Sequence, residues 1–146
     1  MTAVNKINTA VIGATGYTGL DLVHLLSRHP KINILYLCAT KNLGKNLSFF
    51  DNRIIKKLPK ISSVNKIDWG KLDLVFLSLP NGEAQKLIKK IFYKYPKIKF
   101  IDLSADFRIN NFKTYSKNYK IAHKAQHLIK YSIYSISEFN KKKIHK

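Results

Sequence analysis

The chain has 146 residues, of which 45% are hydrophobic, and it carries a formal net charge of +19. This length fits one domain of ordinary size, and this hydrophobic content excludes a disordered chain. No apolar run reaches the roughly 18 residues that cross a bilayer, and the N-terminal residues lack the apolar stretch of a signal peptide. The single cysteine, Cys38, cannot form an internal disulfide, which is typical of a reducing compartment. We therefore expect a cytoplasmic protein without a membrane partner.

The strong positive charge raises nucleic acid as an alternative partner. The lysines, however, are scattered along the whole chain, and only three arginines, the usual readers of bases, are present. Because lysine, isoleucine and asparagine all have A/T-rich codons, we interpret the charge as compositional drift that leaves a solvated lysine surface. We expect no nucleic-acid partner, and a basic nucleic-acid-associated protein is kept as a competing hypothesis.

The first predicted strand, Ile7 to Ile12, runs directly into three glycines at intervals of three, and a helix is predicted from about Gly16 to His29, ended by Pro30. Between a strand and a helix, such glycines permit a sharp turn, the close approach of a pyrophosphate and close packing of the helix. The helix N-terminus adds unpaired N–H groups and the positive end of its dipole. A glycine-rich loop without a ligand is the alternative, because the spacing differs from the commoner GxGxxG. The stretch predicts a nucleotide cradle formed by Gly13, Thr15, Gly16, Tyr17, Thr18 and Gly19.

The second predicted strand, Ile32 to Cys38, is almost continuously apolar, as in a parallel strand that is covered on both faces. Cys38 ends this strand without a basic neighbour, so we interpret it as a buried core residue rather than a nucleophile. Thr40 and Lys41 follow, where an NAD-binding domain usually places an acidic residue on the ribose. A hydroxyl and a cation could hold a 2′-phosphate, which favours NADP(H) over NAD, and a plain turn is the alternative.

The apolar run Asp73 to Leu79 predicts a buried strand, Ile98 to Leu103 predicts the next strand, and apolar residues at helical spacing predict a helix between them. Residues 43–68 show no clear period, apart from a short edge strand expected within Leu58 to Val64. This order predicts an α/β fold, a Rossmann-like parallel sheet with helices on both faces. We expect an NADP-binding domain over 1–109 and an irregular C-terminal segment over 110–146.

Four of the predicted strands are followed by glycines or polar residues: the glycine stretch, Thr40-Lys41, Pro80-Asn81-Gly82, and Ser104 to Arg108. Ligands in parallel sheets bind outside the carboxyl ends of the strands, which all lie on one edge. The gathering of these residues at one edge of the sheet is stronger evidence for a ligand site than any single motif. The histidines show no clustering with other ligand types, so no metal site is expected.

Several segments resemble a known family: Gly13 to Gly19, Thr40-Lys41 with Gly44-Lys45, Leu77 to Gly82, and Ile101 to Arg108. In order and over nearly the whole chain, they are similar to the N-terminal half of the N-acetyl-gamma-glutamyl-phosphate reductases, of the semialdehyde dehydrogenase superfamily. The resemblance implies NADPH-dependent reduction of N-acetyl-gamma-glutamyl phosphate to N-acetylglutamate semialdehyde in arginine biosynthesis. In that reaction a cysteine thiolate attacks the acyl phosphate, the thioester accepts hydride, and a histidine serves as acid–base.

The resemblance also implies roles for individual residues. The glycine stretch would hold the pyrophosphate and Thr40-Lys41 the 2′-phosphate, and Leu79, Pro80 and Asn81 would line the nicotinamide side. Arg108, with Ser104 nearby, would hold the substrate's acyl phosphate, because a guanidinium matches phosphate geometry. An ion pair of Arg108 with Asp106 or Asp102 is the alternative.

In the family, the catalytic cysteine follows a segment similar to Tyr134 to Asn140, within which Ser135 and Ser137 stand in place of the usual glycine and proline. We therefore expect no catalytic residue in this chain, no α+β substrate domain, and no activity of the chain alone. This expectation is compatible with a fragment, a broken gene product or half of a split enzyme. A stand-alone dinucleotide-binding module and a lysine-pathway aminoadipyl-phosphate reductase also stay open. The expected partner is a small acyl-phosphate substrate, and a homo-oligomer of the full-length enzyme is left open.

Overall fold

The computed structural model describes residues 5–144. They form two compact units, one over residues 5–79 and 95–103 and the other over 80–94 and 104–144. Across the described range, every helix is too short or too polar to span a lipid bilayer.

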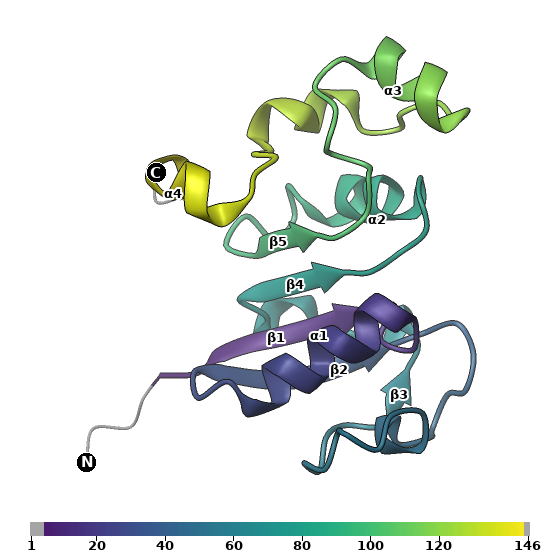
Figure 1. Cartoon of the computed structure of the whole chain (residues 1–146), viewed down its shortest axis with the longest axis vertical. Coiled ribbons are helices and arrows are strands. Elements are labelled where there is room, and N and C mark those ends of the chain that lie inside the picture. Colours follow the sequence, from purple (N-terminus) through teal and green to yellow (C-terminus); the bar gives the residue numbers. More distant parts are fainter. Residues whose placement is uncertain (1–4, 145–146) are drawn as a thin grey trace. The chain divides into compact units, whose positions relative to one another are not determined.

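The first unit contains a sheet of five parallel strands in the order β3-β2-β1-β4-β5 (Figure 1). The strands are β1 (Ile7–Ile12), β2 (Ile32–Cys38), β3 (Ile61–Ser62), β4 (Leu74–Leu77) and β5 (Lys99–Asp102). The last residue of the central strand, Ile12, pairs with Cys38 of β2 on one side and with Leu77 of β4 on the other. The carboxyl ends of these strands therefore lie together at one edge of the sheet, as the sequence predicted.

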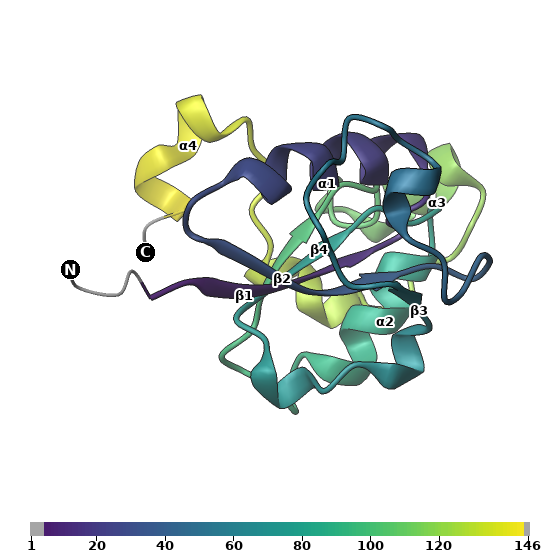
Figure 2. The same ribbon diagram turned by 90° about the horizontal axis from the view of Figure 1, so that it is seen from below.

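One face of β1 and β2 is covered by α1 (Tyr17–Arg28), as Figures 1 and 2 both show. The helix buries Gly19, Val23 and Ser27, because these positions recur at the spacing that places them on one side of a helix. The connection from β2 to β3 adds buried side chains to the same core cluster. That cluster includes Val11, Ala14, Val23, Ile34, Leu37, Leu47, Ile54, Ile61 and Phe76.

An ionic cluster attaches this connection to α1. The Arg53 guanidinium lies 2.7 Å from a carboxylate oxygen of Asp51 and 2.5 Å from one of Asp21, which is on the helix. The hydrogen bonds that the Arg53 side chain donates lower the pKa of the Asp51 carboxyl to about 2. The Asp51 carboxylate thus stays charged, and it keeps Arg53 beside the helix.

The second unit consists of α2 (Glu83–Ile91), α3 (Phe112–Tyr119) and α4 (Ser137–Ile144), with a 3₁₀ turn over Gln126–Tyr131. The N-cap of α3 is Asn111, whose side chain accepts the N–H groups of Lys113 and Thr114. Its C-cap is Lys120, which has a left-handed φ of 58°. Both α3 and α4 have eight residues, so each offers too few turns for a clear apolar period, and neither was predicted from the sequence.

The prediction of an all-parallel, Rossmann-like α/β fold is confirmed. The predicted bounds of β1 and β2 match the structure, and β3 lies within the segment expected to hold a short edge strand. The β4 and β5 strands are shorter at both ends than the apolar runs that predicted them. The division of the chain into residues 1–109 and 110–146 stays a prediction.

Candidate functional site

Gly13 makes the turn from β1 to α1, and the structure requires a glycine there. Its φ is +87°, and a Cβ at this position would lie 1.9 Å from the carbonyl oxygen of Ser78, which follows β4. The N–H groups of Gly13 and Ala14 both donate to the carbonyl of Cys38, at 2.9 and 3.0 Å. The turn is therefore fixed between the ends of β2 and β4, and these two N–H groups are already used by the fold.

The other two glycines of the stretch differ in how much space surrounds them. A Cβ on Gly19 would lie 2.1 Å from the carbonyl oxygen of Gly13. Because glycine has no Cβ, the helix can pack close to the turn. A Cβ on Gly16 would meet only the Gly13 carbonyl oxygen, at an ordinary 3.6 Å. The fold alone therefore does not require glycine at position 16, and the space over this residue is open to a ligand.

The N-terminus of α1 presents unpaired backbone donors. Its N-cap, Gly16, has no side chain to cap the helix, and the first turn contains no acidic residue. Within the described part of the chain, the N–H groups of Tyr17, Thr18 and Gly19 have no backbone acceptor. These three donors and the positive end of the helix dipole fit an anionic group such as a pyrophosphate.

Thr40 and Lys41 lie in the turn after β2, beside the glycine stretch, because Cys38 at the end of β2 accepts the Gly13 N–H. Backbone hydrogen bonds from Ala39 to Ser62 and from Gly44 to Ile61 fix this turn against β3. Both Thr40 and Lys41 are exposed. Among residues 5–144, Lys41 takes part in none of the ion pairs that the structure shows, such as those of Asp21, Asp51, Asp68 and Glu83. Its ammonium group is therefore available to an anion at this edge of the sheet.

In the second unit, the buried carboxylate of Asp106 joins the two remaining motifs. It accepts the N–H of Gly82 at 2.7 Å and the N–H of Gln85 at 3.0 Å, both at the start of α2. The hydroxyl of Tyr115 donates to the same carboxylate at 2.6 Å and accepts from the Gln85 amide at 3.1 Å. Burial raises the pKa of the Tyr115 phenol, which therefore remains a donor.

A buried histidine completes this group. The Ala125 N–H donates to Nδ1 of His123 at 3.2 Å, so the hydrogen bonds assign the proton to Nε2, which lies 2.7 Å from the Asp106 carbonyl oxygen. The His123 ring also packs edge-on against the rings of Phe107 and Tyr115. We call Gln85, Asp106, Tyr115 and His123 the Asp106 network.

The two residues predicted to hold the substrate phosphate lie on either side of Asp106. Ser104 accepts the Asp106 N–H at 3.1 Å through its hydroxyl. The guanidinium of Arg108 is exposed and lies 5.4 Å from the centre of the Tyr134 ring. Because α2 and Tyr115 occupy the Asp106 carboxylate, the alternative of an Arg108–Asp106 ion pair is not formed among the described residues.

The sequence from residue 8 to residue 146 matches the family described as semialdehyde dehydrogenase, NAD binding domain. The chain belongs to this family. A relative named N-acetyl-gamma-glutamyl-phosphate reductase from Ehrlichia ruminantium (strain Gardel) is 43% identical over 135 residues, which are 91% of this chain and 38% of the relative. A probable chloroplastic N-acetyl-gamma-glutamyl-phosphate reductase of Arabidopsis thaliana is 36% identical over 96% of this chain and 34% of its own length. The chain therefore spans well under half the length of these relatives.

Solved structures show the same fold. An aspartate semialdehyde dehydrogenase II of Vibrio cholerae aligns over 71% of this chain and 30% of its own, with a TM-score of 0.55 and 24% identity. An aspartate semialdehyde dehydrogenase of Candida albicans, solved with NADP, aligns over 71% of this chain and 31% of its own, with a TM-score of 0.55 and 23% identity. These similarities support the Rossmann-like fold of the semialdehyde dehydrogenase family.

The predicted site residues fall in both units. The first unit holds the glycine stretch, Thr40, Lys41 and Leu79, and the second holds Pro80, Asn81, Ser104 and Arg108. The sequence interpretation missed the Asp106 network, since it considered Asp106 only as an ion-pair partner and His123 only as a metal ligand. The binding roles of all these residues remain predictions.

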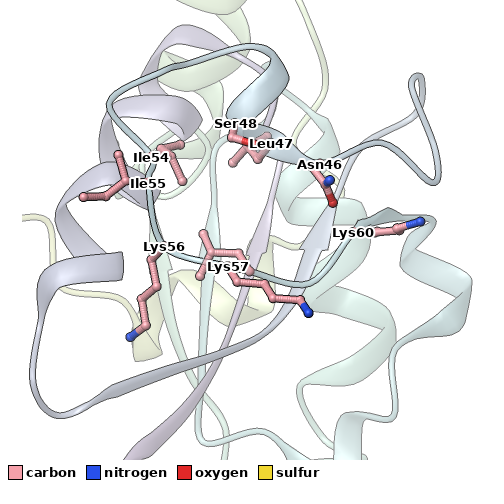
Figure 3. A pocket seen from close by; sticks show the side chains of 9 residues that line it. Asn46, Leu47, Ser48, Ile54, Ile55, Lys56, Lys57 and Lys60 are labelled. Atoms are coloured by element: carbon pink, nitrogen blue, oxygen red, sulfur yellow. The ribbon is translucent and has the colours of Figure 1, made fainter.

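A separate pocket of about 420 Å³ lies in the first unit, lined by residues 46–48, 54–58 and 60 (Figure 3). It shares no residue with the predicted site. Lys56, Lys57 and Lys60 line it, but Figure 3 shows that Lys56 and Lys57 extend in different directions. The Lys56 ammonium also lies 3.4 Å from the Ser27 carbonyl oxygen. The lysines therefore do not converge on one anion position.

Cys38 is fully buried at the end of β2, and its sulfur lies 3.8 Å from the hydroxyl oxygen of Ser62. Burial raises the pKa of the thiol, which disfavours the reactive thiolate. The interpretation of Cys38 as a core residue is confirmed.

Proposed function

We propose that this chain is the NADP(H)-binding part of an N-acetyl-gamma-glutamyl-phosphate reductase. The observation that carries the proposal is the open face of Gly16, where three unpaired N–H groups begin α1 beside the exposed Lys41. Similarity to reductases of this name over 91% of the chain supports the substrate class. The whole reaction would reduce N-acetyl-gamma-glutamyl phosphate to N-acetylglutamate semialdehyde in arginine biosynthesis, with the bound coenzyme supplying the hydride.

The binding roles follow the resemblance and fit the local structure. We assign the pyrophosphate to the stretch from Gly13 to Gly19, with Thr15, Gly16, Tyr17 and Thr18 around the open helix end. Thr40 and Lys41 would bind the 2′-phosphate, which makes NADP(H) the preferred coenzyme. Leu79, Pro80 and Asn81 would line the nicotinamide side, and Ser104 and Arg108 would bind the acyl phosphate. The similar fold of a Candida albicans enzyme solved with NADP supports the choice of coenzyme.

The catalytic cysteine and histidine of the reaction are proposed to lie outside residues 1–146. A nucleophile must be activated by an adjacent base, and the buried Cys38 has a raised thiol pKa. We therefore expect residues 1–146 alone to bind the coenzyme in the cytoplasm without reducing an acyl phosphate.

Replacing Gly16 with alanine should weaken NADPH binding about tenfold or more while lowering the melting temperature by no more than a few degrees. The fold has room for the new Cβ, whereas a pyrophosphate seated on the backbone would be pushed away from its N–H donors. Isothermal titration calorimetry with NADPH, together with thermal unfolding of the same variant, measures both quantities. A wild-type chain that binds neither NADPH nor NADH would refute the cradle.

Replacing Lys41 with glutamate should weaken NADPH binding by roughly tenfold to a hundredfold and NADH binding by much less. The ammonium group would lose a charge-assisted contact with a 2′-phosphate that NADH lacks. The matched control is Lys31→Glu, which makes the same charge change at the turn that precedes β2, at the other end of that strand. Equal losses for both coenzymes would show that Lys41 does not read the 2′-phosphate.

A further inference from the structure

One buried carboxylate determines the geometry of two loops in the second unit. Asp106 lies in the segment from Ser104 to Arg108, and its two oxygens lie 2.7 and 3.0 Å from the Gly82 nitrogen. Gly82 ends the Pro80-Asn81-Gly82 turn with a φ of +91°, and the Glu83 N–H donates to the Pro80 carbonyl within that turn. The turn proposed to line the nicotinamide side is therefore attached directly to the segment proposed to bind the acyl phosphate.

The carboxylate cannot rotate without breaking several hydrogen bonds. One of its oxygens also accepts from Tyr115, and the other accepts from the Gln85 N–H. The Gln85 side chain bonds Tyr115 and the Lys124 N–H, and no buried side-chain polar atom among the described residues lacks a partner. A fully satisfied buried network of this kind fixes one arrangement of the backbone.

The N-termini of α1 and α2 differ in whether an internal carboxylate occupies them. The first turn of α1 is open and holds no acidic residue, whereas the N-terminus of α2 is filled by Asp106 from its own unit. The positive end of the α2 dipole therefore stabilises an internal anion and orients a turn, and it does not take a phosphate.

We propose that Asp106 and Tyr115 are positioning residues, which hold the Pro80-Asn81 turn in the geometry that receives the nicotinamide half of the coenzyme. This inference rests on the proposed function and extends it, since neither residue itself touches the ligand. The adenosine half would contact only the glycine stretch and Thr40-Lys41. Loss of the network should therefore weaken binding of the whole coenzyme but not of its adenosine half.

The test compares NADPH with adenosine 2′,5′-bisphosphate by calorimetry on the whole chain. Tyr115→Phe removes one donor to Asp106 and keeps the ring, so we expect the NADPH dissociation constant to rise about tenfold. The constant for adenosine 2′,5′-bisphosphate should change by less than about twofold. The control is Tyr119→Phe. The ring centres of Tyr119 and Tyr115 lie 4.9 Å apart, and the Tyr119 hydroxyl is outside the Asp106 network. This control should leave both constants unchanged.

Amide hydrogen exchange provides a second measurement that needs no ligand. In Tyr115→Phe, the Gly82 and Gln85 amides should exchange about tenfold faster, while the Leu20 amide of the first unit keeps its rate. Equal changes for both ligands, or unchanged exchange at Gly82 and Gln85, would overturn the positioning inference. A wild-type chain that binds neither ligand would instead overturn the proposed function.

Discussion

Replacing Gly13 with alanine is expected to destabilise the first unit by about 4 kcal/mol or more, a large part of the roughly 5–15 kcal/mol that stabilises an ordinary domain. The new Cβ would lie 1.9 Å from the carbonyl oxygen of Ser78, a backbone atom that β4 holds in the sheet. A left-handed φ of +87° adds a further penalty for any residue with a Cβ. Urea unfolding followed by circular dichroism measures the change.

The matched control for this substitution is Gly44→Ala. Gly44 has nearly the same φ, +82°, but no atom lies within 4 Å of a Cβ built there. Its replacement should therefore cost only about 1 kcal/mol, the penalty for the backbone conformation. If the two variants were equally stable, the close contact with Ser78 would not be what requires glycine at position 13.

Replacing Asp106 with alanine is the second substitution with a large expected effect, a loss of about 3–5 kcal/mol. The N–H groups of Gly82 and Gln85 and the hydroxyl of Tyr115 would all lose their acceptor inside the protein. Because buried donors without partners are strongly unfavourable, α2 and the Tyr115 region should unfold at lower urea concentration. Urea titration combined with tyrosine fluorescence measures this loss.

An exposed aspartate serves as the control for Asp106. Asp68 also accepts an N–H at the start of a helical turn, from Gly70 at 3.2 Å, and pairs with Lys71 at the surface. Water can replace it, so Asp68→Ala should cost less than about 1 kcal/mol. A similar loss in both variants would contradict the view that burial makes the Asp106 contacts strong.

The sequence predicted β1 and β2 to the residue because both are apolar runs with sharp ends, at Gly13 in one case and at Thr40 in the other. It did not predict the path between β2 and β4. That stretch contains a two-residue strand and three short 3₁₀ turns, which are too brief to produce a period. Its order comes instead from single contacts such as the Arg53–Asp51 pair.

The candidate site likewise has one part that the sequence predicted and one part that it did not. The spacing of the glycines was enough to predict close packing of the helix on the turn, and in the structure Gly19 allows it. The Asp106 network could not be found by pattern, because its hydrogen bonds join residues up to 39 positions apart that share no period. The weak signal that was present is a carboxylate between Ala105 and Phe107, shortly after an apolar run, where an unpaired charge is unfavourable.

The uncapped N-terminus of α1 leaves backbone N–H groups free for a ligand, and it leaves the helix less stable than a capped one. An aspartate in place of Thr18 would offer its own carboxylate to the free N–H groups and strengthen the helix. The same carboxylate would repel a phosphate from that position. If the proposed pyrophosphate binds here, selection for stability alone would remove its site, and the lack of an acid in the first turn would be the cost of keeping it.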